Sequence, residues 1–428
     1  MFGRIGPLGR RPQRFVDTQK DTQFSDVWVV LVLILTGIGL LIDSAFLTAA
    51  ATLILVGIGF SWLWSRVSFA GLFYRRHFSE IRAFTGENVE LALEVHNQKV
   101  LPLTWLNIVD AFPAGLPVSD KDLQTNPTTN IAELRTFWML GPFQKMRRRF
   151  NVQCIHRGFY RYGPAQVSTG DPFGFFSRRS TLDIQDRLII YPRLYSVAEL
   201  RLPTHNPFGE TRARGRLFED PLRIVGIREW QSSDSLQRVH WKATARHQAL
   251  LSRVYEPSEE QQVLLFLNVA TMERHWHGHI PELQERTISV TASLASLAAE
   301  QRLPVGLIAN GALPGSDQSL RLLPGRSAGQ LVRLLELLAL VTNFATEPIE
   351  QMLLREAPKA PWGATLVIVT AIAHNELLAA LMDLSAAGRR VVLFTLAEEP
   401  PRQFLPGITV YHLPHLVDDL VAPAIIQS

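Results

Sequence analysis

The sequence contains one cysteine, Cys154, in 428 residues. An intrachain disulfide is therefore excluded, and the composition fits a reducing compartment. The short motifs of common enzymes are also missing: there is no nucleophile elbow, phosphate-binding loop, CxxC pair or HExxH zinc motif. Charged residues make up 19% of the chain and hydrophobic residues 47%. These values exclude a disordered chain and a transporter with many spans.

Two uncharged apolar runs lie near the N-terminus, at residues 27–42 and 45–64. A membrane-spanning helix needs roughly 17–25 apolar residues. The second run is long enough, and the first reaches this length if residues 24–26 lie at the interface. A cleaved signal peptide is the alternative, but a long polar stretch precedes the first run and a second run follows it. The sequence predicts a two-helix transmembrane hairpin over 25–65, after a basic N-terminus over 1–24.

Glycines in both runs let helix backbones approach closely. Gly37 and Gly39 are expected to face Gly57 and Gly59 across the hairpin.

Basic residues flank the hairpin on both sides. They are Arg4, Arg10, Arg11, Arg14 and Lys20 before it, and Arg66, Arg75, Arg76 and Arg82 after it. The connection between the runs carries only Asp43. The positive-inside rule then predicts a cell-membrane protein with both termini and the soluble body in the cytoplasm. Such flanks suit anionic lipid headgroups better than a nucleic-acid groove.

Residues 78–200 show the pattern of an antiparallel β-sandwich or barrel. Residues 89–96 alternate apolar and polar side chains, which is typical of a half-buried strand. Turn residues separate the further expected strands, which are 103–109, 147–155, 160–167 and 188–191. The cluster of basic residues over 145–149 is interpreted as a charged strand edge.

Residues 262–428 alternate buried strands with helices, which predicts a parallel sheet covered on both faces. The expected strands are 263–267, 305–309, 364–370, 390–396 and 408–413, and the expected helices are 283–302, 327–341 and 376–387. Residues 201–261 join this α/β domain to the sandwich. The fold class is therefore α+β and multidomain.

The joining segment holds the most distinctive motif, which runs from Arg228 to Arg246. It resembles the signature of the bacterial family known as domain of unknown function 58, roughly Arg-Glu-Tyr, Gly-Asp-Ser, Arg-Ile-His-Trp-Lys and Ala-Arg. The matching residues are Arg228, Glu229, Asp234, Ser235, His240, Trp241, Lys242, Ala245 and Arg246. Upstream, Asp171, Pro172, Phe173 and Gly174 match the family's Asp-Pro-Phe-Gly element, and 157–160 match its Arg-Gly-Arg-Tyr element. Trp230, Ser233 and Gln237 depart from the pattern.

The resemblance implies a von Willebrand factor type A-like, Rossmann-like C-terminal domain. It also implies a membrane-tethered partner of a MoxR-type AAA+ ATPase that serves in assembling or activating other proteins. No enzymatic activity and no cofactor are implied, and the oligomeric state is left open.

The signature has three interpretations. If 235–245 is helical, Asp234 caps the helix, while Arg228, Glu229, Lys242 and Arg246 form a buried ion-pair network joining the two domains. The same residues could instead form a partner-binding surface. The third interpretation is acid–base catalysis by Asp234, His240, Lys242 and Arg246.

Metal binding has two candidate positions. Metal-binding type A domains place Asp-x-Ser-x-Ser after the first strand, but Asn268, Ala270 and Met272 occupy these places, and Ala371 stands where a later aspartate is expected. A metal-ion adhesion site is therefore not expected. The alternative function is a metal-dependent hydrolase that binds zinc through His275, His277 and His279.

Overall fold

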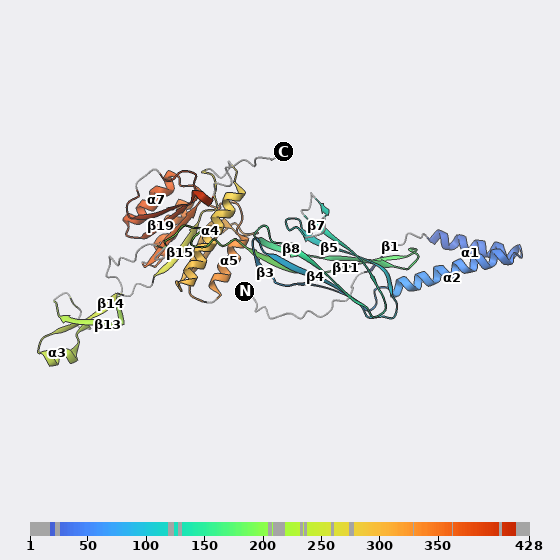
Figure 1. The fold of residues 1–428 in the computed structure, drawn as a ribbon, viewed down its shortest axis with the longest axis horizontal. Coiled ribbons are helices and arrows are strands. Elements are labelled where there is room, and N and C mark those ends of the chain that lie inside the picture. Colours follow the sequence, from blue (N-terminus) through green and yellow to red (C-terminus); the bar gives the residue numbers. More distant parts are fainter. Residues whose placement is uncertain are drawn as a thin grey trace. The chain divides into compact units, whose positions relative to one another are not determined.

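The structure is a computed structural model. It describes residues 18–21, 26–118, 124–126, 131–203, 208, 219–231, 234, 238–257, 261–273, 278–327, 329–361, 363–401 and 405–416. The chain divides into two compact units, Met1–Tyr191 and Pro192–Ser428. Figure 1 labels their elements.

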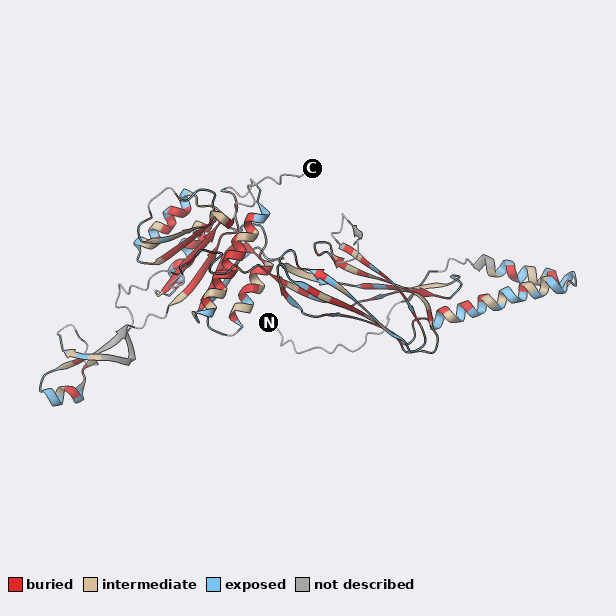
Figure 2. Cartoon of the chain, in the orientation of Figure 1, coloured by how far each residue is buried: buried red, intermediate tan, exposed pale blue. Residues whose placement is uncertain are grey.

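The first unit contains an antiparallel pair of helices, α1 (Asp26–Leu41) and α2 (Ala45–Val67). Asp43 turns the chain between them with φ of +52°, and Ser44 caps α2. Most of their apolar side chains are exposed (Figure 2), because the helices bury only the stripe where they touch. Among the described residues, α2 is the one helix long and apolar enough to cross a membrane; α1 is shorter.

The predicted glycine contacts are wrong. A Cβ at Gly39 would lie 2.9 Å from the side chain of Thr48, whereas Gly37, Gly57 and Gly59 have open space around them. In an antiparallel hairpin, residues meet when they are equally far from the turn. Gly39 is close to Asp43 and Gly57 is far from it, so the two cannot meet.

The rest of the first unit is built from sheets that enclose a common core. One sheet has the order β1-β11-β10-β5-β7-β6, a second β2-β4-β8 and a third β3-β12-β9. The strands are β1 (Thr18–Asp21), β2 (Leu72–Phe78), β3 (Arg82–Phe84), β4 (Asn88–Asn97), β5 (Leu103–Pro113), β6 (Gln124–Asn126), β7 (Ile131–Leu140), β8 (Lys145–Gln153), β9 (Gly158–Tyr162), β10 (Ala165–Gly170), β11 (Ser177–Leu182) and β12 (Asp186–Tyr191).

Most pairings are antiparallel, as expected, but β3 and β12 run parallel. The single strand predicted at 160–167 is two strands, β9 and β10, in different sheets. Gly163 separates them with φ of +99°, and a Cβ there would lie 1.9 Å from the Ile184 carbonyl oxygen. Basic side chains of β8 pair across the sheet with Glu90 and Glu94 of β4. The cluster at 145–149 is thus an ordinary charged strand face.

A buried ion-pair cluster lies inside the first unit. The Arg76 guanidinium donates to Asp110 at 2.9 Å, to Asp186 at 3.0 Å and to the Ile184 carbonyl oxygen at 2.7 Å. The hydroxyl of Tyr74 donates to Asp110, and burial raises the pKa of Tyr74. Because these charges are paired and hydrogen-bonded, they can stay in the core.

The second unit contains a six-stranded sheet of order β17-β16-β15-β18-β19-β20, with helices packed on it (Figure 1). Its elements are β15 (Gln262–Leu267), α4 (Pro281–Glu300), β16 (Val305–Ala312), β17 (Ser319–Gly325), α5 (Gln330–Leu340), α6 (Ile349–Glu356), β18 (Ala364–Thr370), α7 (Asn375–Ala386), β19 (Arg390–Thr395) and β20 (Ile408–His412). Every strand and helix predicted after residue 262 is confirmed. The edge strand β17, which is antiparallel, and helix α6 were not predicted.

Candidate functional site

The signature forms a hairpin of its own within the second unit. Strand β13 (Glu219–Glu229) pairs with β14 (Leu251–Pro257), and the short helix α3 (Trp241–His247) lies between them in the chain. Val239 and Ala243, together with Ser252 of β14, are buried where α3 meets the strands. The residues of the signature divide into an inner and an outer group.

The inner group holds the hairpin together. The two terminal nitrogens of Arg228 donate to the two carboxylate oxygens of Asp234 at 2.6 and 2.7 Å, and the Gln231 amide donates to Asp234 at 3.0 Å. These bonds favour the carboxylate, and they lower the pKa of Asp234. His240 accepts a hydrogen bond from the Ala243 amide through Nδ1 at 3.1 Å. Nδ1 is therefore the unprotonated nitrogen of this imidazole.

This geometry corrects the predicted helix over 235–245. The helix begins at Trp241 and its cap is His240, not Asp234. Asp234 closes the turn after β13, because Arg228 and the Gln231 amide are already placed to bind it. Ser235 lies outside the described residues.

The outer group consists of Glu229, Trp241, Lys242, Ala245 and Arg246, which are all exposed. The expected buried ion-pair network is therefore wrong. Trp241 exposes 63% of its surface although tryptophan is usually largely buried. Lys242 and Arg246 occupy adjacent turns of the helix, four residues apart, and place two positive charges on one side of it.

The upstream Asp-Pro-Phe-Gly element lies in the first unit, in the turn between β10 and β11. The buried Asp171 carboxylate accepts hydrogen bonds from the amides of Phe173, Phe175 and Phe176 at 3.0, 3.3 and 2.6 Å. Gly174 supplies φ of +78° within this turn. Pro172, Phe173 and Gly174 are exposed, so the aspartate fixes a turn whose tip faces outward.

The carboxyl edge of the sheet in the second unit carries a neutral hydrogen-bond network. Asn268 Nδ2 donates to Thr370 Oγ1 at 3.0 Å, Asn310 Nδ2 donates to Asn268 Oδ1 at 2.9 Å, and Asn310 Oδ1 accepts from the Val269 amide at 2.8 Å. All three side chains are buried. Amides and a hydroxyl thus bond to one another at the edge where open α/β sheets commonly bind ligands. Sequence reasoning singled out Asn268 but missed Asn310, whose position became apparent only from the pairing of β15 with β16.

Among the described residues, no group of three His, Cys, Asp or Glu side chains is arranged to hold a metal. His275 and His277 lie outside the described residues. His279 is described: its ring lies 6.5 Å from that of Phe344, and its Nε2 lies 3.5 Å from Asn343 Nδ2.

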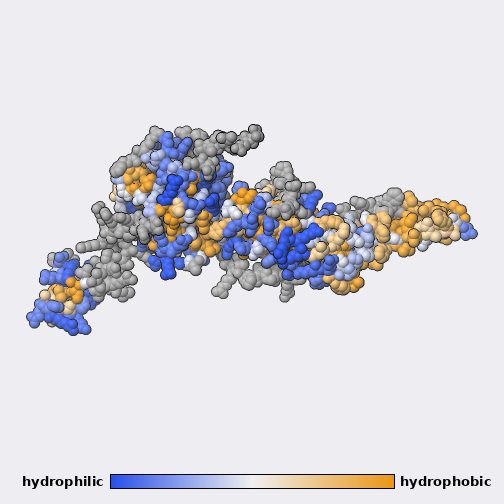
Figure 3. All heavy atoms as spheres, viewed as in Figure 1, coloured by the Kyte–Doolittle hydropathy of each residue, from blue (hydrophilic) through white to orange (hydrophobic). Residues whose placement is uncertain are grey.

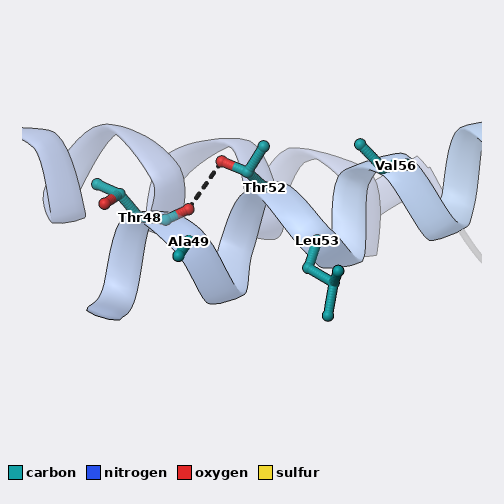
Figure 4. A pocket seen from close by; sticks show the side chains of 5 residues that line it. All are labelled: Thr48, Ala49, Thr52, Leu53 and Val56. Atoms are coloured by element: carbon teal, nitrogen blue, oxygen red, sulfur yellow. Dashed lines mark hydrogen bonds between the residues drawn. The ribbon is translucent and has the colours of Figure 1, made fainter. Parts of the chain in front are cut away.

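Two hollows lie away from the signature. A cleft of about 470 Å³ in the second unit is lined by Arg193, Tyr195, Ala198, Glu199, Arg201, Arg286, His415 and Leu416. Arg193 is paired there with Glu199 at 3.1 Å. An open groove of about 460 Å³ runs along α2 beside Thr48, Ala49, Thr52, Leu53 and Val56 (Figure 4). The Thr52 hydroxyl donates to the Thr48 carbonyl oxygen at 2.7 Å, so it is already satisfied within the helix.

Comparison with known proteins agrees with the signature. A curated relative, the uncharacterized protein YeaD of Bacillus subtilis strain 168, is 21% identical over 238 residues, which is 55% of this chain and 55% of YeaD. The chain thus spans about half the length of this relative.

The similarity of this chain to solved structures is weak, as the TM-scores show. The CARDB domain of a Pyrococcus furiosus protein has a TM-score of 0.19 at 9% identity, over 28% of this chain and 91% of that one. A cohesin module from Clostridium perfringens has a TM-score of 0.19 at 10% identity, over 27% of this chain and 94% of that one. Likenesses this weak carry no argument. The family evidence is that residues 226–399 match the sequence profile of the family described as protein of unknown function DUF58.

Proposed function

We propose that this protein is a membrane-anchored cytoplasmic scaffold that binds a partner protein through its signature hairpin and catalyses no reaction itself. The observation that carries the proposal is the division of the signature. Hydrogen bonds of Arg228, Asp234 and His240 hold the hairpin, whereas Trp241, Lys242 and Arg246 are exposed on the same short helix. An exposed tryptophan flanked by cations is the composition of a binding surface, since Trp and Arg dominate binding energy at interfaces.

The anchor in this proposal is the pair α1 and α2, with both helices in the membrane and both termini in the cytoplasm. The length and apolar surface of α2 support the second span. The first span is supported by the packing of α1 on α2, which keeps its apolar residues next to those of a spanning helix. Basic residues on both sides of the two apolar runs and the lone Asp43 between the runs support the orientation, although Arg76 is buried in the ion-pair cluster and does not contribute.

The α/β part of the second unit is proposed to be von Willebrand factor type A-like. Its sheet has one antiparallel edge strand, β17, beside five parallel strands, and this topology supports the proposal. The partner is proposed to be a MoxR-type AAA+ ATPase, on the basis of the family resemblance of the signature.

An affinity pull-down from native membranes tests this function. The full-length protein is compared with a Trp241→Ala/Arg246→Ala variant and with a matched control, Phe344→Ala/Arg333→Ala, which removes an exposed aromatic residue and an exposed cation elsewhere in the second unit. The expected result is that an AAA+ ATPase is retained by the wild type and the control and lost by the first variant. Retention by the hairpin variant, or absence of an ATPase from every sample, would contradict the proposal.

A further inference from the structure

Three loops lie at the end of the first unit from which the helices emerge. The register of the strands fixes their position: Leu72 pairs with Asn97, Leu103 pairs with Leu140, and Gly170 pairs with Ser177. The loops over 98–102, 141–144 and 171–176 therefore share one end of the sheets. Strand β1 points toward the same end, since its last residue, Asp21, also pairs with Ser177.

The 98–102 loop is bonded directly to the end of α2. The Lys99 ammonium donates to the carbonyl oxygens of Ser68 and Ala70, the latter at 3.0 Å, and the Gln98 amide donates to the Gly71 carbonyl oxygen at 2.7 Å. The 141–144 loop is bonded to it in turn, because the Phe143 amide donates to the Lys99 carbonyl oxygen at 3.2 Å. Hydrogen bonds thus connect the 98–102 and 141–144 loops to the end of α2.

Each loop carries an exposed apolar side chain at its tip. Val100 exposes 71% of its surface, Phe143 63% and Phe173 64%. None of these side chains contributes to the core of the first unit. The turn that carries Phe173 is held by Asp171, and Phe173 stacks on Phe175 with ring centroids 6.0 Å apart. The three loops thus place three exposed apolar side chains at one end of the unit, and apolar side chains gathered on one surface mark a contact with a membrane or a partner.

The length of α2 identifies the surface that these tips meet. Its 23 residues extend for about 34 Å, whereas the hydrocarbon core of a bilayer is about 30 Å thick. When α2 spans the membrane, its last turn already lies in the headgroup region, and the loops bonded to Ser68 and Ala70 lie there too. Aromatic residues prefer this region. Figure 3 shows hydrophobic atoms in orange over the helices and again where they join the β-rich unit.

We propose that Val100, Phe143 and Phe173 insert into the lipid interface, so that the Asp-Pro-Phe-Gly turn and its two neighbouring loops form a membrane-contacting platform around the anchor. This inference rests on the proposed membrane anchor. The basic side chains of Arg66 and Arg178 at the same end add attraction to anionic headgroups. The platform fixes the first unit against the bilayer by several points of contact instead of by the helices alone.

Single-cysteine labelling of the full chain in vesicles tests the platform. Cys154 is buried, and burial raises its pKa to about 11, so an introduced exposed thiol is labelled selectively. Val100→Cys, Phe143→Cys and Phe173→Cys each receive an environment-sensitive fluorophore. Ile81→Cys and Ile155→Cys are matched controls, because they replace exposed apolar residues at the opposite end of the same unit.

The labelled proteins are reconstituted into vesicles of phosphatidylcholine and phosphatidylglycerol, and flotation is measured with the fluorescence. We expect all five to float. At positions 100, 143 and 173 we expect the fluorophore to emit at shorter wavelength than in water, to be quenched by nitroxide-labelled lipid and to be protected from quenching by iodide. We expect none of these three effects at positions 81 and 155.

Other outcomes separate the two proposals. Flotation without a difference between the loop and control labels would overturn the platform and leave the anchor standing. Absence of flotation would overturn both. Protection of the loops in native membranes but not in pure-lipid vesicles would show that a protein covers them, and it would also overturn the lipid platform.

Discussion

At the scale of single residues, carboxylates in both the Asp-Pro-Phe-Gly element and the signature accept hydrogen bonds from backbone amides. Asp171 binds three amides of its own turn, and Asp234 binds the Gln231 amide as well as Arg228. Such short-range bonds set the shape of a loop without contacting any ligand, because an ionised carboxylate accepts several N–H donors at once. These aspartates therefore have a structural role, and in the proposed function the binding surface belongs to their neighbours.

Replacing Asp171 by alanine is expected to destabilise the first unit. Three amides lose a charged acceptor, and a hydrogen bond to a charged group contributes about 1.5–3 kcal/mol. We expect the free energy of unfolding to fall by about 2–3 kcal/mol in denaturant melts, since the bonds share one carboxylate and the exposed turn regains water. Asp183→Ala is the control, because Asp183 is exposed. An equal effect in the two variants would refute this role of Asp171.

The pairing of Asp234 predicts a pH dependence of the hairpin. Its pKa is lowered in the folded state by the Arg228 and Gln231 bonds, so its contribution to stability is present above the ordinary Asp pKa of about 3.9. This contribution is lost as the pH falls through the lowered folded pKa. Hydrogen exchange of the Gln231 amide should stay protected at pH 5 and lose its protection only well below about pH 4. In Asp234→Asn this acid-dependent loss should disappear; a loss near neutral pH would argue against the pairing.

At the scale of elements, the carboxyl edge of the second sheet is closed by its own side chains. Asn268 follows β15, Asn310 lies within β16 and Thr370 ends β18, and the three meet because β15 lies between the other two strands. A neutral network in this position satisfies buried backbone and side-chain groups without a charge. Strand β18 is buried throughout and β15 is buried from Val263 to Leu267, as expected for central strands of a sheet covered on both faces.

Asn310→Ala should destabilise the second unit more than expected from the few atoms that the substitution removes. The change leaves the Val269 amide without its partner and removes one of the two hydrogen bonds that Asn268 Oδ1 accepts, the other coming from the Ala270 amide. A buried polar group without a partner costs about 1–3 kcal/mol. A fall of about 2–4 kcal/mol in the free energy of unfolding is expected.

The control for this change is Asn343→Ala, since Asn343 is exposed. If Asn310→Ala unfolds at the same denaturant concentration as this control, the network does not support the sheet edge.

At the scale of the whole molecule, the proposed anchor formed by α1 and α2 sets the side of the membrane on which each soluble part resides. With α1 and α2 in the bilayer, everything after Ser68 stays on the side from which the chain entered. In this proposal the β-rich part of the first unit lies next to the membrane, and the signature hairpin belongs to the second unit, which follows it in the chain.

Cysteine accessibility in intact cells checks this topology. A membrane-impermeant maleimide should label Asp43→Cys directly and Leu250→Cys only after the cells are permeabilised, because Asp43 joins the two helices and Leu250 lies on the exposed surface of the hairpin. Buried Cys154 serves as the unlabelled background. Direct labelling of position 250 would place the soluble body outside the cell and contradict the proposed orientation.

Local sequence patterns determined the secondary structure and the class of fold. Period-two alternation over 89–96 predicted β4, and buried runs followed by amphipathic stretches predicted the α/β part, because such periods report which face of one element is buried. The motif at 228–246 also located the distinctive segment. The local pattern could not predict which charged side chains of the motif pair with one another. The predicted ion-pair network between the domains is replaced by one pair, Arg228 with Asp234.

Only the tertiary structure decided which distant residues meet. Arg76 forms ion pairs with Asp110 and Asp186. Asn268 forms hydrogen bonds with Asn310 and Thr370. The loops that carry Val100, Phe143 and Phe173 lie at the end of the sheets next to the end of α2. Each of these meetings depends on strand order and register, which are set by the packing of whole sheets and not by any local period. The sequence therefore identified the elements, and the pairing of the strands assembled the sites.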